Sequence, residues 1–533
     1  MALVLTNGQG EEGSTSVIIR SARPRAETAG VKKAALIPQH DSIDTLSKHY
    51  ADLRGLGSGA FGSVRLVEDK RFGQKRVCKV VSTRAMAPLV LEAMRKEIRL
   101  LRSLDHPSIV RLYEYAEDPV AEQLTLILEY INGGDCGELL RERQASRMPL
   151  EEPLVARLVY QLLVALSFCH DRGVAHRDIK PGNMMLICAE GGGEPDCKLI
   201  DFGLAERSTQ SMKDFVGSPK YMAPELHRKA HYSFKADVWS AGVTALQFLT
   251  GAVPFVPPWA KDIGGYKDFG VLEERLVGNE AWAMRSDEAR EFVESLLVAS
   301  VDERPTAADA LGFPCLEMHK PPARKFRKDI ARSLVGYTAA PSVVRCCLLS
   351  IAARVGAENA EAIGHAFLGA DTDGDGLISH EDLDLALQDM DGFKWWCDSA
   401  SKVNVARVLE TADLAHRGGV GFTEFMAACL YGEYRSLEDL AEKAFYALDD
   451  DRDELITVEQ IQGMFRQRDK PFLSRLPRQR PFGRAEWVAR VLDYASDGSM
   501  EVISSPDMDD DSDDSSARAG FLDLSACYCG KNR

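Results

Sequence analysis

The chain has 533 residues, of which 45% are hydrophobic, so it is too long for one compact core and we expect several folding units. Its 81 acidic residues outnumber its 65 basic residues, and the formal charge of −16 argues against nucleic-acid binding and suits a protein that handles cations. The twelve cysteines show no repeated zinc-type spacing, which predicts reduced thiols and a cytoplasmic protein.

Neither a secretory signal nor a membrane span is expected. The start, MALVLTNGQG, lacks a charged region followed by a long apolar core, and Ala2 stands where N-myristoylation requires glycine. Membrane attachment is therefore not indicated, with acylation of Cys527 or Cys529 as the alternative to ordinary tail cysteines. Residues 1–47 mix small and charged residues with little periodicity, which predicts a flexible N-terminal arm.

Short strand patterns begin near Tyr50 and include a glycine-rich stretch, GSGAFGSV, at Gly57–Val64. Backbone amides approach phosphates only where side chains are absent, so this stretch predicts a lid over nucleotide phosphates. A tight hairpin would explain the stretch equally well if it stood alone. Fifteen residues after Val64, the run VCKV places Lys79 on a strand that reaches the phosphates, and the combination is specific.

Apolar spacing predicts a helix over residues 89–101, LVLEAMRKEIRLL. Glu97 on this helix is the expected partner of Lys79, with Glu92 as the competitor and a solvated helix face as the alternative for either. Residues 124–131, LTLILEYI, predict a buried strand that runs into a hinge.

After the hinge, Asp135 either faces a ribose or caps the next helix, and the two interpretations stand level. Further on, the stretch His176–Asn183, HRDIKPGN, combines a carboxylate, a lysine and a carboxamide at the spacing of a phosphoryl-transfer centre. Asp178 would take the proton of a substrate hydroxyl, and Asn183 would hold a metal ion. Eighteen residues beyond Asn183, Asp201 of a DFG triplet can meet the same metal cluster.

The segment from Asp201 to Glu225 is expected to order when Arg177, beside the catalytic aspartate, meets an anion. Phosphorylation of a hydroxyl could supply that anion, but acidic residues are already present, and constitutive acidity is the favoured alternative. The hydroxyls are those of Ser208, Thr209 and Ser211, and the acids are Glu206 and Asp214. Arg304 is expected to pair with Glu225 as a structural salt bridge.

The stretch 319–341, HKPPARKFRKDIARSLVGYTAAP, is basic and punctuated by prolines. It is either a solvated linker or an autoinhibitory segment whose basic residues mimic a substrate and occupy the catalytic cleft. Residues 342–355, SVVRCCLLSIAARV, have apolar residues on a helical face and suit the groove of a calcium sensor.

A calcium-binding EF-hand loop is predicted at Asp371–Asp382, DTDGDGLISHED. Acids occupy loop positions 1, 3 and 5, Gly376 permits the turn at position 6, and the carbonyl of Leu377 follows at position 7. Position 12 is Asp382 rather than glutamate, so the calcium ion would be held less tightly and magnesium would compete better. The three acids are Asp371, Asp373 and Asp375.

Three further segments repeat this loop in degraded form. The second, 413–424, keeps both end carboxylates but has Ala415 and Arg417 where ligands belong, and the arginine opposes a cation. The third, 449–460, keeps three acids but ends in Gln460, so weak binding is expected. The fourth, 493–504, lacks the closing acid and is expected to bind nothing alone. Paired hands still make sense as a structural unit.

In this order, the motifs resemble the calcium-dependent protein kinases of plants and of apicomplexan and related protists. The resemblance covers about residues 48–505 and implies an α+β multidomain chain, a bilobal protein kinase fold followed by an all-α, calmodulin-like EF-hand domain. The implied order is a flexible arm at 1–47, a kinase domain at 48–316, an autoinhibitory junction at 317–356, the EF-hand domain at 357–505 and an acidic disordered tail at 506–533.

The resemblance implies a serine/threonine kinase that transfers the γ-phosphate of ATP to protein hydroxyls. Its junction would hold it off at low calcium and contact the EF-hand domain when calcium binds. ATP, Mg²⁺ and Ca²⁺ are the implied cofactors, and proteins bearing serine or threonine the implied substrates. Ser218 would mark this specificity, whereas Gly182 departs from the usual KPEN and makes a simple preference for arginine-rich sites doubtful.

The site residues that motif and resemblance imply fall into four groups. Leu128 would guard the back of the nucleotide pocket, and the backbone of Glu129 and Tyr130 would contact adenine. The catalytic residues are Asp178, Lys180, Asn183, Lys79 and Glu97; the ATP-binding residues are Leu56, Gly57, Ser58, Gly59, Ala60, Gly62, Val64, Lys79, Glu129, Asp135 and Asp201; the magnesium ligands are Asn183 and Asp201; and the calcium ligands are Asp371, Asp373, Asp375, Leu377 and Asp382.

Two other functions compete with a calcium-controlled kinase. The nearer one is an active kinase with little calcium dependence, whose EF-hands are mainly structural. A pseudokinase scaffold is disfavoured, because a scaffold would need a broken catalytic set and every expected catalytic residue is present.

Overall fold

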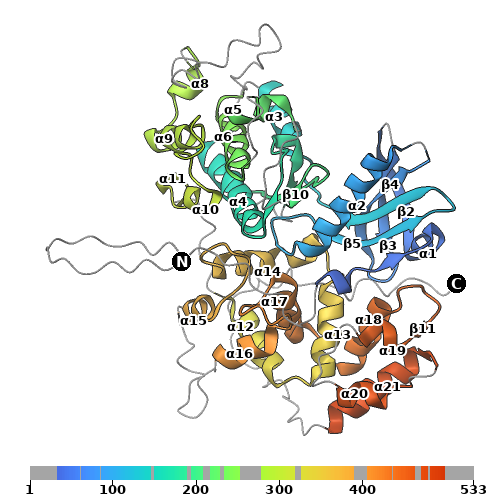
Figure 1. The fold of residues 1–533 in the computed structure, drawn as a ribbon. Helices are drawn as coiled ribbons and strands as arrows, with labels where there is room; N and C mark the ends of the chain where they lie inside the picture. Colours follow the sequence, from blue (N-terminus) through green and yellow to red (C-terminus); the bar gives the residue numbers. More distant parts are fainter. Residues whose placement is uncertain are drawn as a thin grey trace, which may run out of the picture.

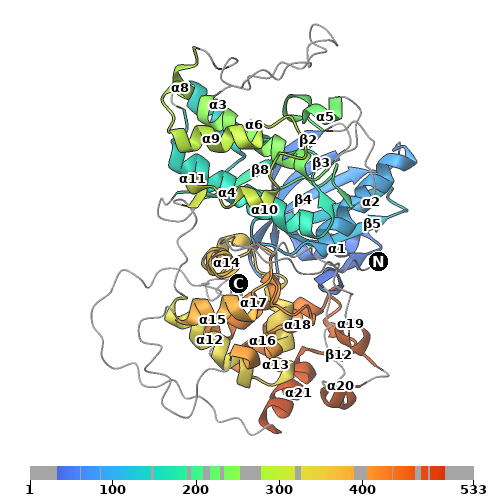
Figure 2. The ribbon, with the colours of Figure 1, turned by 60° about the vertical axis from the view of Figure 1, so that its left-hand side comes forward.

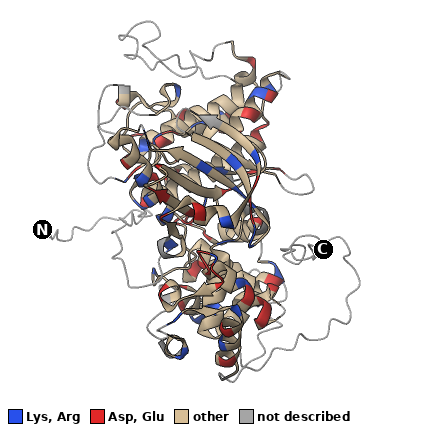
Figure 3. Ribbon diagram, turned by 90° about the vertical axis from the view of Figure 1, so that its right-hand side faces the viewer, with Lys and Arg blue, Asp and Glu red and all other residues tan. Residues whose placement is uncertain are grey.

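The computed structural model describes residues 33–497, except for 60–61, 85, 146–148, 189–193, 208–216, 228–232, 252–275, 277, 318–325, 389–404, 435, 463–469 and 478–479. Two lobes of a kinase-like domain lie above a helical domain that packs against both of them (Figures 1 and 2). Acidic and basic residues are interspersed along the described parts of both domains (Figure 3).

The N-terminal lobe is a six-stranded sheet in the order β1-β5-β6-β4-β3-β2, with helix α2 (Pro88–Ser103) beside it (Figure 1). Every neighbouring pair is antiparallel except β1 and β5, which are parallel. The strands are β1 (Gln39–His40), β2 (Tyr50–Gly59), β3 (Gly62–Asp69), β4 (Gln74–Ser82), β5 (Leu112–Asp118) and β6 (Gln123–Glu129).

The prediction of a flexible arm up to residue 47 is wrong for residues 33–47, while residues 1–32 lie outside the described part. This segment forms η1 (Lys33–Leu36), the edge strand β1 and helix α1 (Ile43–His49). Leu36 and Ile37 are buried, at 6% and 5% exposure, and they pack into different hydrophobic cores. Short strands and single apolar residues give too little periodicity to stand out in a sequence.

The C-terminal lobe is built around α4 (Glu152–Asp171), with twelve buried residues, and α6 (Lys235–Thr250). The length and apolar composition of α4 alone would allow it to cross a membrane, but 67% of its most apolar window is buried in the lobe, as in a core helix. The other described elements are α3 (Cys136–Ala145), β7 (Val174–Ala175), η2 (Pro181–Asn183), β8 (Met184–Ile187), β9 (Asp196–Leu199), β10 (Glu206–Arg207), η3 (Pro219–Tyr221), α5 (Pro224–His227), α8 (Glu280–Ala283), α9 (Asp287–Leu296), α10 (Ala307–Ala310) and α11 (Pro314–Glu317).

The helical domain, called the sensor domain below, begins at residue 326 rather than at 357. Its core contains the junction helices α12 (Lys328–Ala339) and α13 (Ser342–Ala352), and nine of the eleven residues of α13 are buried. A helix that is apolar on most faces must be covered on most faces, so α13 packs against α17 and α18. The described part of the junction therefore lies in the sensor core and not in the catalytic cleft; residues 318–325 lie outside the described part.

The remaining sensor helices form hands joined by short strand pairs. They are α14 (Ala357–Ala370), α15 (His380–Gln388), α16 (Val405–Ala412), α17 (Phe422–Cys429), η7 (Leu430–Glu433), α18 (Leu437–Leu448), β11 (Leu455–Ile456), α19 (Val458–Gln462), α20 (Lys470–Arg475), β12 (Phe482–Gly483) and α21 (Arg484–Asp497).

Candidate active site and cation-binding loops

Lys79 and Glu97 meet between the sheet and α2. Lys79 lies in β4 opposite Val64 of β3, and its Nζ is 3.5 Å from Oε1 of Glu97. Burial raises the pKa of the Glu97 carboxyl, and the charge of Lys79 opposes that rise. Glu92 instead contacts Arg99 at 2.6 Å on the outer face of the helix. Of the two candidates, the structure pairs Glu97 with Lys79.

Three polar groups converge on the Asp178 carboxylate. The Nζ of Lys180 lies 2.7 Å from Oδ2, and the Nδ2 of Asn183 donates to the same oxygen at 3.0 Å. The Ser218 amide donates to Oδ1 at 2.9 Å, and Lys180 also reaches the Ser218 hydroxyl at 3.0 Å. Burial alone would raise the pKa of Asp178, but these hydrogen bonds lower it, so the carboxylate stays ionised.

Asp237 of α6 holds the backbone of the HRD loop. Its carboxylate accepts from the amides of His176 and Arg177, each at 2.9 Å. The ring of His176 packs edge-on against Phe202, at 4.8 Å between centroids. Arg177 and Asp201 both have positive φ, 70° and 63°, the kind of backbone strain that clusters at functional sites.

Asp201 and Asn183 fit a magnesium ion. Asp201 is exposed, and a Cβ at Gly203 would lie 3.2 Å from its Oδ1 and 3.6 Å from the Oε2 of Glu97, so a glycine lets these groups approach. Because the Nδ2 of Asn183 donates to Asp178, its Oδ1 is the atom left to face a metal ion. A carboxylate and an amide oxygen are donors that Mg²⁺ accepts.

The glycine-rich stretch forms the hairpin between β2 and β3, with Gly57 opposite Val64 and Gly59 opposite Gly62. A Cβ at Gly62 would lie 1.9 Å from the carbonyl oxygen of Val80, so this glycine permits close packing of β3 on β4. Leu56 is 43% exposed. Of the predicted lid residues, Ala60 lies outside the described part, as does the side chain of Ser58.

Asp135 and Glu129 both have polar partners in the structure. The sequence left two interpretations open for Asp135, and it did not predict the partner of Glu129. Asp135 caps α3, since its Oδ1 accepts from the Glu138 amide at 2.9 Å. The buried carboxylate of Glu129 contacts the Nζ of Lys198 at 2.8 and 2.9 Å, so only the backbone of Glu129 is left for adenine. Sequence reasoning missed Lys198, because a lysine in a short strand carries no motif.

Glu206 supplies the anion that Arg177 was predicted to need. It lies in β10, which pairs with β7, and its Oε2 is 3.7 Å from Nη1 of Arg177. Lys96 of α2 contacts the same carboxylate. Arg304 and Glu225 form the expected buried salt bridge, at 2.8 and 3.0 Å. The alternative sources of an anion lie outside the described residues. They are the phosphorylation candidates Ser208, Thr209 and Ser211, and the acid Asp214.

The first EF-hand loop brings three carboxylates together. One oxygen each of Asp371, Asp373 and Asp375 lie within 4.8 Å of one another. Asp371 Oδ2 accepts from the Gly376 amide at 2.9 Å, while its buried Oδ1 has no hydrogen-bond partner among the described residues. Burial, and then the charge of Asp375, raise the pKa of Asp371 to about 8. Such a donor set fits a hard cation.

The other two predicted calcium ligands, Leu377 and Asp382, are not members of the cluster of three acids. The Asp382 carboxylate accepts from the amides of Thr372 and Ser379, at 3.2 and 2.9 Å, and is not grouped with the three acids. The Leu377 amide donates to Asp375 Oδ1 at 2.8 Å, consistent with an EF-hand turn. The loop also touches the kinase domain, because Arg172, which follows the last residue of α4, donates to the Asp375 carbonyl at 2.9 Å.

The third loop repeats the acid cluster. Asp449, Asp451 and Asp453 also have carboxylate oxygens within 4.8 Å of one another, and Oδ1 of Asp449 is buried without a partner among the described residues. Burial and the neighbouring carboxylates raise the pKa of Asp449 to about 6. Gln460 at the closing position accepts from the Thr457 amide at 2.6 Å. This loop also fits a cation.

The predicted position of the fourth loop, 493–504, is wrong. The third loop pairs through β11 with β12, Ile456 opposite Phe482, so the fourth loop is 475–486. Residues 493–497 belong to α21, and 498–504 lie outside the described part. The error arose from matching acids, whereas the true loop carries Arg475 and Arg480 and is recognisable only by its strand register. The first pair of hands shows the same face-to-face bridge, between Ile378 and Val420.

The sensor domain contacts the kinase domain behind the hinge through buried polar groups. Arg111, just before β5, donates to the Thr423 hydroxyl at 2.9 Å and to the Val355 carbonyl at 3.2 Å. The Asp105 carboxylate accepts from the Thr423 amide at 2.9 Å and so caps α17. On the C-terminal lobe, His365 of α14 contacts Asp196.

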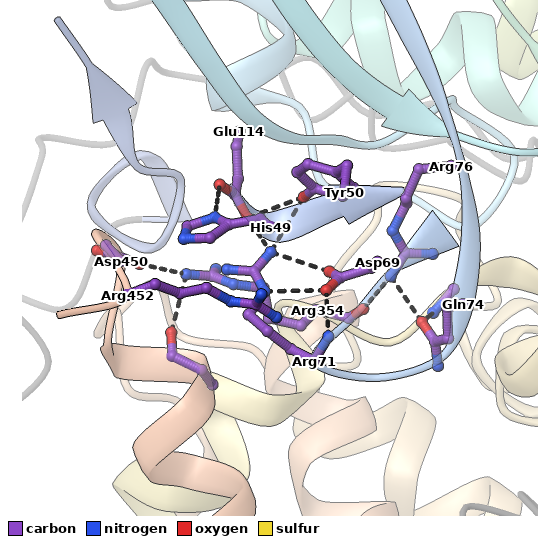
Figure 4. A network of polar contacts seen from close by, with 12 residues as sticks. His49, Tyr50, Asp69, Arg71, Gln74, Arg76, Glu114, Arg354, Asp450 and Arg452 are labelled. Carbon is purple, nitrogen blue, oxygen red and sulfur yellow. Dashed lines mark hydrogen bonds and ion pairs between the residues drawn. The ribbon is translucent and has the colours of Figure 1, made fainter. Parts of the chain in front are cut away.

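A second set of contacts joins the N-terminal lobe to the third hand (Figure 4). Arg354, just after α13, donates to Asp450 Oδ1 at 3.0 Å, and Arg76 donates to the Arg354 carbonyl. Arg452 donates to the Lys48 carbonyl at 2.6 Å. None of these residues was predicted, because charged side chains scattered over distant segments form no sequence pattern.

Comparison with known proteins gives consistent matches. The family model described as protein kinase domain matches residues 50–316. Calcium-dependent protein kinase 16 of Oryza sativa subsp. japonica is 31% identical over 427 residues, which cover 78% of this chain and 74% of that protein. Calcium-dependent protein kinase 34 of Arabidopsis thaliana is 27% identical over 469 residues, which cover 86% of each.

Proposed function

The chain belongs to the calcium-dependent protein kinases, serine/threonine kinases with a C-terminal calcium-binding domain, and on that premise we propose which of its residues carry out phosphorylation and its control. The observation that carries the proposal is the convergence of Lys180, Asn183 and Ser218 on the Asp178 carboxylate.

Asp178 orients the substrate hydroxyl and takes its proton, because it is an ionised carboxylate fixed on both oxygens. Lys180 spans Asp178 and Ser218, so its ammonium lies where negative charge moves during transfer. Lys79, oriented by Glu97, grips the phosphates of ATP. Asp201 and Asn183 would hold magnesium, which neutralises phosphate charge when bound.

In the sensor domain, the first loop would hold calcium through Asp371, Asp373, Asp375 and the Leu377 carbonyl, with Asp382 closing the loop. Calcium supplies the positive charge that relieves repulsion among these acids. The loop backbone contacts Arg172 of the kinase domain, which gives calcium a direct effect on docking. The third loop is a second, weaker calcium site of the same kind.

With Glu206 as the anion, the contact between Arg177 and the segment Asp201–Glu225 needs no phosphorylation. We therefore place control of activity in the sensor domain rather than in an upstream kinase. The same observation suits the competing function, a kinase with little calcium dependence, which would also need no activating phosphate.

Phosphorylation rates of the purified full chain, in chelator and then in micromolar calcium, test the proposal. We expect a faster rate in calcium, and Asp178→Asn should lower kcat by about 10²–10⁴-fold in both conditions. Equal rates of the wild type in chelator and in calcium would favour the competing function, an active kinase whose EF-hands are mainly structural. No activity in either condition, or an Asp178→Asn variant at the parent rate, would contradict the catalytic assignment.

A further inference from the structure

The EF-hand loops differ in how their end carboxylates are satisfied. In the first and third loops, Asp371 and Asp449 each keep one buried oxygen without a hydrogen-bond partner among the described residues. In the second loop, neither Asp413 nor Glu424 has such an oxygen. The second loop still has EF-hand geometry, because Val420 makes both bridge hydrogen bonds with Ile378, at 2.9 and 3.0 Å.

Arg417 completes the second loop from within. Its Nη2 lies 2.6 Å from Oε2 of Glu424, the residue that would close the loop around an ion. Asp413, at the first position, accepts from the Arg417 and Gly418 amides at 2.9 and 2.8 Å. A Cβ at Gly421 would lie 2.0 Å from Nη2 of Arg417, so the guanidinium occupies the space beside the first turn of α17.

The electrostatic balance of the loop follows from this contact. Burial raises the pKa of the Glu424 carboxyl, and the charge of Arg417 and the amide of Gly421 oppose that rise. The amides of Ala415 and Gly421 each donate to Glu424 at 2.8 Å. The guanidinium of Arg417 thus pairs with the carboxylate that would otherwise bind calcium.

The fourth loop has the same arrangement in a more exposed position. Arg480, at position 6, donates two hydrogen bonds to Glu486 at position 12, at 2.9 and 3.0 Å. The side chain of Arg480 is 60% exposed, against 35% for Arg417. Each pair of hands therefore combines one loop of three acids with one loop closed by arginine.

We infer that Arg417 is the built-in cation of the second hand: it excludes calcium from that loop and holds the loop closed without it. This inference rests on the proposed calcium role of the first hand. It makes Arg417 the residue that decides which loop of the pair takes the ion.

A permanently closed second hand has a consequence for docking. Glu424 lies beside Thr423 in the first turn of α17, and Thr423 is the residue that engages Asp105 and Arg111 of the kinase domain. Arg417 therefore keeps this docking contact formed at every calcium concentration. Through the bridge from Val420 to Ile378, it also braces the first loop, where calcium acts.

Calcium stoichiometry of the full chain, measured by equilibrium dialysis, tests the exclusion. Glu424→Gln should bind as many ions as the wild type. The double variant Ala415→Asp with Arg417→Asp completes the ligand positions and should bind one more ion, while Ala415→Asp alone, which keeps Arg417, should bind no more. Loss of an ion in Glu424→Gln, or equal stoichiometry in the double and single variants, would overturn the inference.

Hydrogen exchange in chelator tests the closure without any calcium. Arg417→Gln should speed exchange at the Val420 and Thr423 amides about tenfold, as expected for losing a charged hydrogen bond. Arg417→Lys keeps the charge and should retain most of the protection. Unchanged exchange in Arg417→Gln would overturn the inference. A wild type that binds no calcium would instead defeat the proposed function and leave this readout intact.

Discussion

The residues that we propose to carry the chemistry were predictable from their motifs. The spacing within HRDIKPGN fixes which side chains share a loop, and the structure brings Asp178, Lys180 and Asn183 together. The choice of Glu97 over Glu92 was also correct, because only Glu97 faces the sheet. Lys198 and Arg111 could not be predicted, since their partners come from distant parts of the chain.

Glu206 gives the first prediction at this scale. Glu206→Gln removes the anion that faces Arg177 and Lys96, so kcat with calcium should fall roughly tenfold, the effect of losing one charged contact. Steady-state kinetics on a peptide substrate measure it. Glu206→Asp keeps the charge and should retain most activity, and Glu288→Gln, at an exposed position of α9, should have no effect. Full activity of Glu206→Gln would show that another anion orders the segment.

Asp371 gives a prediction about pH in the absence of calcium. Its pKa is raised from 3.8 to about 8, so between these values the folded chain holds a proton that the unfolded chain has lost. Folding stability must then fall as the pH rises through this window. In chelator, the melting temperature should be lower at pH 8 than at pH 6, and Asp371→Asn should remove most of the difference. An unchanged difference in melting temperature between pH 6 and pH 8 in this variant would show that titratable groups other than Asp371 cause it.

At the scale of elements, the strands and helices of the kinase domain followed their sequence patterns, while the edges of the domains did not. Residues 33–47 were predicted to belong to a flexible arm, because their ordering depends on two neighbours, the sheet edge and the sensor core. The fourth hand was misplaced because acids, rather than strand register, guided the match. Helix α13 was predicted correctly, and so was its place in the sensor domain, because its apolar positions indicated a helix held in a sensor groove.

Leu36 tests whether the segment 33–49 joins the two domains. Its side chain packs in the sensor core, and its carbonyl accepts from Arg354 at 2.8 Å. Leu36→Ala should lower the free energy of unfolding by about 2–3 kcal/mol, the usual cost of truncating a buried leucine. Denaturant unfolding of the full chain measures this, with Leu385→Ala, at 57% exposure, as the control. Equal stabilities of the two variants would show that the segment does not join the domains.

At the scale of the whole molecule, the sensor domain holds both lobes from behind the hinge. Arg111 and Arg76 contact it from the N-terminal lobe, and Arg172 and Asp196 from the C-terminal lobe. The order of the domains was visible in the sequence. Their arrangement was not, because it depends on buried polar pairs that are individually unremarkable.

The ratio of phosphorylation rates in micromolar calcium and in chelator, measured for loop variants of the full chain, tests the central claim most directly. The account predicts that Asp371→Ala with Asp373→Ala loses most of the calcium response, whereas Asp413→Ala, in the loop that Arg417 closes, keeps the wild-type ratio. A response that survives in the first variant, or that falls equally in both, would contradict control of the kinase by calcium at the first hand.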